Sequence, residues 1–127
     1  MSFLYELRRN DQVINSSDSI EDFFENIYHR MENNELESGD SFTTSVTDGF
    51  SEGRYFIIYN LDNYNFGSRS VAFTKTLEEA IDEAETVHYG PSGNQSYIYE
   101  VEYDGGNLVT VVKKIKTRVV SKLCVID

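Results

Sequence analysis

Acidic side chains that recur along two amphipathic segments are the residues in this sequence best placed to do chemistry. Residues 76–88 contain five carboxylates and no lysine or arginine: Glu78, Glu79, Asp82, Glu83 and Glu85. Residues 19–33 carry Glu21, Asp22 and Glu25 in their first turns. Like charges four residues apart on a helix repel by roughly 0.2–0.5 kcal/mol, so such faces do not serve stability. We predict that these eight residues dock on a basic partner. The simpler alternative is that they only form two solvent-exposed helix faces.

Residue types for metal or nucleophilic chemistry are scarce. The single cysteine, Cys124, lies in an apolar run with no cation nearer than Lys122, and two histidines with one cysteine are too few for a usual structural zinc set. Calcium-loop, phosphate-loop, dinucleotide-binding and Gly-x-Ser-x-Gly motifs do not occur. Under this interpretation we expect no metal, no cofactor and no catalytic residues.

A second interpretation comes from the later half of the chain. The order Asn65-Phe66, Val71–Ala80, Ala84-Glu85, Tyr97–Glu102 and Val119–Asp127 resembles the later half of small bacterial ADP-ribosyltransferases of the rifampicin-modifying type. The resemblance covers about residues 64–127 and implies an enzyme that uses NAD.

The resemblance also implies roles for four residues. Members of that family hold NAD with a His or Arg on the first strand, where Arg8 is the candidate in this sequence. Tyr64 would stack on the nicotinamide, and Glu100 or Glu102 would hold a ribose hydroxyl. The His-Gly-Thr opening of the family is absent from this sequence.

Two helices must position the acidic residues. Apolar residues at i, i+3, i+4, i+7, i+8 and i+11 from Ile20 to Met31 predict a helix over 19–33, with Asp18 or Ser19 as N-cap. The run Thr76-Leu77-Glu78-Glu79 has the form of a capping box and predicts a second helix over 76–88. Acids in the first turn of each helix suit the positive end of the helix dipole.

Runs of β-branched and aromatic residues predict a sheet. The expected strands are 3–9, 41–47, 54–61, 70–74, 96–103, 108–116 and 119–126. We expect one domain over 1–127 with an α+β fold, in which an antiparallel or mixed sheet of about five to seven strands carries both helices on one face. The two helix starts lie 57 residues apart and two Asp-Gly turns lie 56 residues apart. A domain built from two similar β-α-β halves is therefore an alternative.

The basic residues gather at the C-terminal end. The turn Asp104–Asn107 predicts a hairpin that brings Lys113 and Lys116 beside the strand with Glu100 and Glu102. We expect these lysines to stabilise the sheet by cross-strand charge pairing.

Net charge excludes several function classes. The 127 residues include 22 acidic and 11 basic ones, and residues 1–106 alone hold 21 acidic and 6 basic residues. Such a body repels a phosphate backbone, so we expect no direct contact with nucleic acid. Uncharged runs fall far short of the roughly 20 apolar residues that a membrane span needs. The N-terminus lacks the pattern of an export signal, so we expect a cytoplasmic protein without membrane contact.

These observations predict a small acidic, non-enzymatic inhibitor that docks on a basic, nucleic-acid-binding surface of another protein. Short acidic domains of this kind are typical of phage or mobile-element anti-defence proteins, which include DNA mimics and anti-CRISPR proteins. In such a protein, carboxylates occupy the places where phosphates normally bind. An NAD-dependent transferase and an immunity protein to a toxin are the alternatives.

Overall fold

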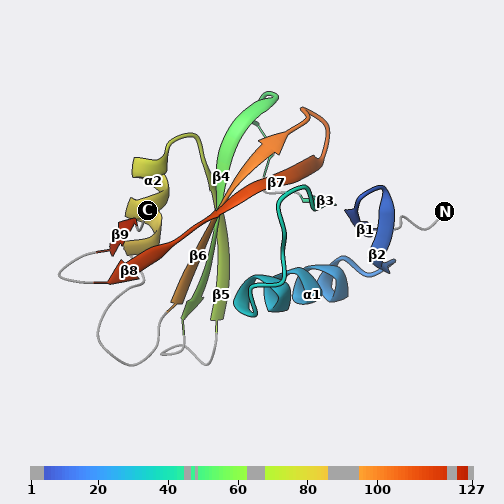
Figure 1. Cartoon of the computed structure of the whole chain (residues 1–127), viewed down its shortest axis with the longest axis horizontal. Helices are drawn as coiled ribbons and strands as arrows, with labels where there is room; N and C mark the ends of the chain where they lie inside the picture. The colour runs from blue at the N-terminus through green and yellow to red at the C-terminus, as the bar shows by residue number, and fades with distance from the viewer. Residues whose placement is uncertain are drawn as a thin grey trace.

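An antiparallel sheet forms the centre of the chain (Figure 1). The computed structural model describes residues 5–44, 47, 49–62, 68–85, 95–119 and 123–125. Along the chain the elements are β1 (Tyr5–Arg9), β2 (Gln12–Ser17), α1 (Ile20–Glu32), β3 (Ser41–Thr43), β4 (Gly53–Asp62), β5 (Ser68–Thr74), α2 (Leu77–Glu85), β6 (Gln95–Tyr103), β7 (Leu108–Ile115), β8 (Thr117–Val119) and β9 (Leu123–Val125). Seven strands form one sheet in the order β2-β1-β3-β7-β6-β4-β5, and each neighbouring pair is antiparallel. The predicted α+β class is confirmed.

Strand β2, which forms a hairpin with β1, is an addition to the predicted strands, whereas β1 lies within the predicted strand 3–9. The two-residue turn of the hairpin has positive φ at both positions, 52° at Asn10 and 63° at Asp11, as a type I′ turn requires. Arg9 pairs with Gln12 across this turn. Four of the six residues of β2 are polar, so it lacks the β-branched run from which strands are predicted.

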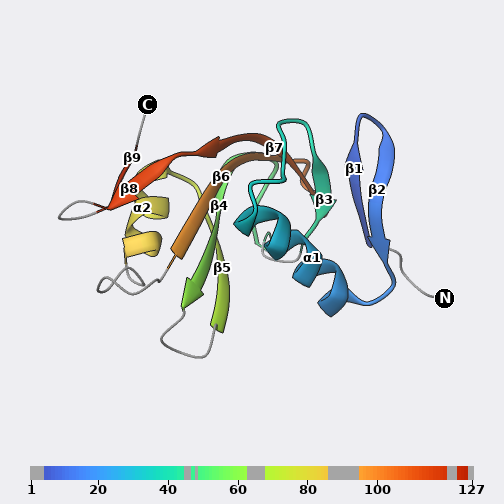
Figure 2. The same ribbon diagram turned by 60° about the horizontal axis from the view of Figure 1, so that its bottom comes forward.

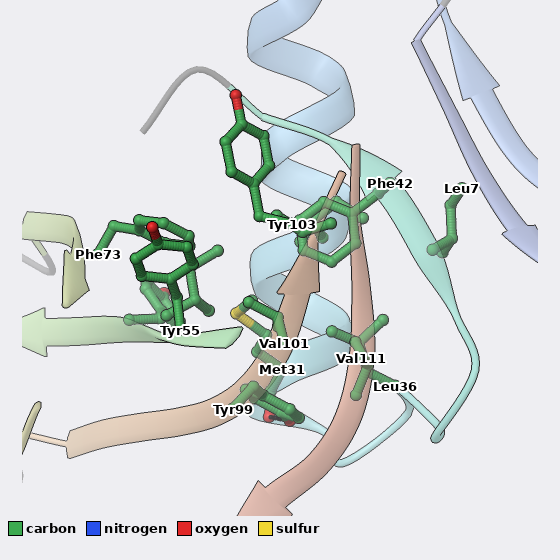
Figure 3. Packing of buried hydrophobic residues seen from close by; sticks show 14 of the residues in the cluster. Leu7, Met31, Leu36, Phe42, Tyr55, Phe73, Tyr99, Val101, Tyr103 and Val111 are labelled. Carbon is green, nitrogen blue, oxygen red and sulfur yellow. Dashed lines mark hydrogen bonds between the residues drawn. The ribbon is translucent and has the colours of Figure 1, made fainter. Parts of the chain in front are cut away.

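Helix α1 packs its apolar stripe on one face of the sheet. It begins after Ser19, whose side chain accepts a hydrogen bond from the Asp22 N–H at 3.3 Å. Phe23, Ile27 and Met31 are at most 1% exposed and belong to a core cluster with tyrosines and valines of the sheet. Figure 3 shows Met31 of α1 close to Val101 and Tyr99 of β6. The helix predicted from residue spacing is confirmed.

Helix α2 covers the opposite face, so the expectation that both helices share one face is wrong. Ile57 and Tyr59 of β4 belong to the α1 cluster, whereas Ile58 between them packs with Ala80 and Ala84 of α2. Figure 1 shows the strands β4, β5 and β6 between the two helices. The continuous apolar run of residues 55–59 explains the arrangement, because a strand with two apolar faces must be covered on both.

The two helix-containing halves are built differently. Helix α1 connects the β1–β2 hairpin to β3, which pairs directly with β1. Helix α2 connects β5 to β6, and β4 lies between these two strands. Figure 2 shows the β1–β2 hairpin at one end of the sheet and α2 at the other.

Two short strands lie in the last described part of the chain, where one strand was expected. β8 and β9 pair antiparallel as a separate two-stranded sheet, with Thr117 opposite Val125. The single strand predicted over 119–126 is therefore wrong. In the sequence, Ser121 and Lys122 interrupt the apolar run on which that prediction depended. Cys124 belongs to β9.

A buried aspartate, Asp40, binds the segment between α1 and β3 to strand β1. Asp40 is fully buried, and its two carboxylate oxygens accept hydrogen bonds from Arg9 of β1, at 2.8 Å from Nε and 2.9 Å from Nη2. One of these oxygens also accepts from the Glu37 N–H at 2.9 Å. Burial alone would raise the pKa of Asp40, but these hydrogen bonds and the nearby cationic charges hold the pKa below its ordinary value.

Candidate functional site

Helix α2 presents a row of outward carboxylates. Thr76 caps the helix, because its Oγ1 accepts the Glu79 N–H at 3.1 Å and its carbonyl accepts the Ala80 N–H. Ala80 and Ala84 are fully buried against Ile58 and Ile98, which fixes the orientation of the helix. The acids on the other side are therefore exposed: Glu78, Glu79, Asp82 and Glu83.

The charge of this face is not neutralised within α2. The helix contains no basic residue, and none of the ion pairs between described residues includes Glu78, Glu79 or Asp82. Glu85 is the last residue of α2, and its side chain lies outside the described set. We call the exposed residues Glu78, Glu79, Asp82 and Glu83 the α2 acidic face.

The acids of α1 lie on the other side of the sheet and are partly neutralised. Glu25 pairs with Arg69 of β5 and with His29, whose Nε2 lies 3.1 Å from Glu25 Oε1. The hydrogen bond from Arg69 lowers the pKa of Glu25. Glu21 and Asp22 are exposed near the start of the helix. The eight predicted docking residues are therefore split between two faces of the molecule, and the α1 set includes one carboxylate that is already engaged.

The partner of Glu25 belongs to a polar cluster that joins α1 to the sheet. Tyr59 is fully buried; its hydroxyl donates to Glu32 Oε1 at 2.7 Å and accepts from Arg69 Nε at 2.9 Å. Burial and the hydrogen bond to Glu32 raise the pKa of Tyr59, so this phenol stays protonated. The ring of Tyr28 stacks on Tyr59, with 4.8 Å between centroids. These contacts join α1 to strands β4 and β5.

The transferase resemblance assigns roles to Arg8, Glu100 and Glu102, and the structure does not place Arg8 beside the two glutamates. Arg8 is exposed on β1 and pairs with Glu6, while Glu100 and Glu102 lie on β6. Strands β3 and β7 separate β1 from β6, and at about 4.8 Å per strand the backbones of β1 and β6 are roughly 14 Å apart. Tyr64 lies outside the described residues.

Arg54 of β4 forms ion pairs with Glu100 and Glu102 of β6. Its Nη1 lies 2.7 Å from Glu100 Oε2 and its Nη2 lies 2.5 Å from Glu102 Oε1. Lys113 lies directly opposite Glu100 in the register, as the predicted hairpin requires, but the ion pairs go to Arg54. The predicted placement of Lys113 beside Glu100 is confirmed, but among the described residues the ion pairs of these glutamates are made by Arg54 and not by a lysine.

Arg54 and Arg69 are the residues that the sequence analysis missed. Both are single cations in strands whose acidic partners lie 44–48 residues away in the chain. Short-range spacing cannot locate such partners. The one local signal was the i, i+4, i+7 spacing of Glu25, His29 and Glu32 on one helix face, which marks a place for a cation.

Other kinds of site are not found in the part of the chain that the structure describes. It contains no group of three His, Cys, Asp or Glu residues that could hold a metal ion. The helices described, α1 and α2, are also too short and too polar to cross a membrane.

Comparisons with known proteins return no relative. The chain matches no protein-family model, no curated protein and no solved structure.

Proposed function

We propose that the protein is a non-enzymatic binding protein whose α2 acidic face docks on a basic surface of another protein. One observation carries the proposal: the acids of α2 have no basic neighbour in their helix, whereas Glu25 and Glu32 of α1 pair with Arg69 of β5. Repulsion along α2 lowers helix stability, so the fold alone does not account for the row.

The geometry of α2 suits a docking role. Because Ala80 and Ala84 are anchored on the sheet, the carboxylates above them are held on a rigid support. Successive helical turns are 5.4 Å apart, so acids at positions 78, 79, 82 and 83 form a short line of negative charge. Such a line raises the association rate with a basic surface and selects that partner over acidic ones.

The partner class follows from this chemistry. Extended basic surfaces on proteins are mostly those that bind nucleic acid, because they must neutralise several phosphates. A rigid row of carboxylates would occupy phosphate positions on such a surface and act as an inhibitor. With a net charge of −11, the rest of the body favours the same approach and opposes direct binding of nucleic acid.

Two charge-matched variants test this function. The α2 variant carries Glu78→Gln, Glu79→Gln and Asp82→Asn. The control variant carries Glu21→Gln, Asp22→Asn and Glu35→Gln, three exposed acids outside α2. Each variant removes the same charge, so a purely global effect of net charge changes both equally.

Affinity capture from a host lysate is then compared at low and high salt. We expect the wild type and the control variant to retain the same basic protein at low salt, the α2 variant to lose it, and high salt to release it. Equal retention by both variants, or loss in the control variant alone, contradicts the proposal. Circular dichroism confirms that both variants are folded.

A further inference from the structure

A buried tyrosine on the α1 side of the sheet has a carboxylate as its hydrogen-bond acceptor. Tyr59 is fully buried, and its hydroxyl donates to Glu32 Oε1 at 2.7 Å. Three other tyrosine hydroxyls donate to backbone carbonyl oxygens instead: Tyr55 to Ser51, Tyr99 to Met31 and Tyr103 to Gly106. A carboxylate can take up the proton of a phenol, whereas a peptide carbonyl oxygen cannot hold it near neutral pH. Tyr59 therefore has a proton acceptor in place.

A chain of polar groups leads from this acceptor to solvent. The second oxygen of the Glu32 carboxylate, Oε2, lies 3.1 Å from Nδ1 of His29. The other ring nitrogen of His29, Nε2, lies 3.1 Å from Glu25 Oε1, and the imidazole is 53% exposed. Carboxylate and imidazole groups at hydrogen-bond distance pass protons readily, because each can act as donor or acceptor. A proton that leaves Tyr59 thus has a hydrogen-bonded route to the surface of α1.

Arg69 keeps the phenol oxygen hydrogen-bonded when the proton has left. Its Nε donates to the Tyr59 oxygen at 2.9 Å, so the oxygen of a deprotonated ring still has a partner in the core. Loss of the proton alone is unfavourable, because burial and the hydrogen bond to Glu32 raise the pKa of Tyr59. Removal of an electron reverses this, since the radical cation of a phenol is a strong acid. Proton and electron therefore leave this ring together.

Two further tyrosine rings connect Tyr59 to the surface. Tyr28 of α1 stacks on Tyr59 with 4.8 Å between centroids and 11° between planes, and Tyr97 of β6 stacks on it at 5.7 Å and 18°. Both rings are partly exposed, so an oxidant at the surface can draw an electron through them. The negative charge of Glu32 favours loss of the electron from Tyr59. Lys114 Nζ lies 5.5 Å from the Tyr97 centroid, and this cation disfavours the loss there.

We propose that Tyr59 is a one-electron redox site of this protein. An outer-sphere one-electron oxidant takes one electron from the stacked tyrosine rings and is itself reduced. The O–H bond of Tyr59 breaks, its proton binds Glu32 Oε1, and a neutral tyrosyl radical remains on the buried ring. Burial shields this radical from solvent and from other radicals, so it persists. The site is separate from the α2 acidic face and does not depend on the docking function.

Flash photolysis of the full chain tests the site. Light-excited tris(bipyridine)ruthenium(II) is converted to the ruthenium(III) oxidant by a cobalt(III) acceptor, and tyrosyl radicals are followed by absorbance and by electron paramagnetic resonance. Exposed tyrosines are oxidised as well, but their radicals decay rapidly by coupling with one another. We expect an additional radical in the wild type that lives longer by about tenfold or more, which is a decay barrier higher by about 1.4 kcal/mol. Absence of this long-lived radical overturns the proposal.

Matched variants assign the long-lived radical to one ring. Tyr59→Phe should lose it. Tyr103→Phe should keep it, because the buried Tyr103 hydroxyl also donates at 2.7 Å but to the Gly106 carbonyl oxygen. Circular dichroism confirms folding, and Tyr55→Phe, which removes a hydroxyl bound to the Ser51 carbonyl oxygen, replaces a control that does not fold. Persistence of the radical in Tyr59→Phe, or its loss in a folded control, contradicts the assignment.

Proton transfer to Glu32 has its own test, which also serves if Tyr59→Phe does not fold. Glu32→Gln keeps an oxygen that accepts the Tyr59 hydrogen bond but cannot take up the proton, so the yield of the long-lived radical should fall by about tenfold or more. Glu35→Gln, at an exposed acid, is the charge-matched control and should keep the yield. The radical of the wild type should also form more slowly in heavy water. An unchanged yield in folded Glu32→Gln, or equal rates in the two solvents, contradicts the proposal.

Discussion

At the scale of single residues, buried polar contacts hold the outer part of the sheet together. Asp40 is the clearest case, because its side chain is inaccessible to solvent while it binds Arg9 and the Glu37 N–H. Asp40→Ala should lower the free energy of unfolding by about 2–3 kcal/mol, since it removes the buried acceptor shared by the Arg9 guanidinium and the Glu37 N–H. Urea unfolding measures this. Glu6→Ala, which breaks only the exposed pair with Arg8, should change stability by less than about 0.5 kcal/mol.

Because of Asp40, we expect the stability of the protein to depend on pH. The folded pKa of Asp40 is depressed below its unfolded value of about 3.9, so its stabilisation is present above that pH. The contribution is lost as the pH falls through the folded pKa. The stability gap between wild type and Asp40→Ala should therefore narrow as the pH is lowered from about 5 to about 3. A gap that stays constant over this range would show that the charge of Asp40 is not what stabilises the segment.

Replacing Arg54 or Lys113 tests which of these cations stabilises the acidic side chains of β6. Because the ion pairs of Glu100 and Glu102 go to Arg54, Arg54→Gln should lower the Tm more than Lys113→Gln does. Added salt should reduce the difference, since these groups are partly exposed. A larger effect of Lys113→Gln would restore the cross-strand lysine pairing expected from the sequence.

At the scale of elements, the N-cap residue Thr76 stabilises α2, the helix that carries the proposed docking surface. Thr76→Ala removes the side-chain acceptor of the Glu79 N–H and should cost about 1 kcal/mol of stability. Thr76→Ser keeps an acceptor and should have a much smaller effect. Chemical unfolding followed by circular dichroism checks both. Equal stability of the two variants would mean that the cap does not stabilise α2.

Helix positions were predictable because their determinants are local. The spacing of Ile20, Phe23, Ile27 and Met31 and the Thr76 cap depend on neighbours within a few residues. The face that each helix covers was not predictable by the same means, because it depends on pairing between distant strands. The run from Tyr55 to Tyr59 did contain the signal, since five consecutive apolar residues in one strand require cover on both sides.

At the scale of the whole molecule, negative charge dominates but is distributed unequally. Arg69 pairs with Glu25 on the α1 side, and Arg54 pairs with the two glutamates of β6. The α2 acidic face has no cation of its own helix. Composition predicted an acidic protein, but only the three-dimensional pairing distinguishes acids such as Glu25 and Glu100, which pair with arginines, from Glu78, Glu79 and Asp82, which are in none of the ion pairs between described residues.

Displacement of nucleic acid from the captured partner shows whether the α2 acidic face docks on a nucleic-acid-binding surface. Labelled nucleic acid bound to that partner is titrated with the wild type, the α2 variant or the charge-matched control variant, and its release is followed by fluorescence anisotropy. We expect release by the wild type and the control, and at least about tenfold weaker release by the α2 variant, with the difference shrinking as salt is added. Equal release by both variants, or none by the wild type, would contradict a docking role for the α2 acidic face.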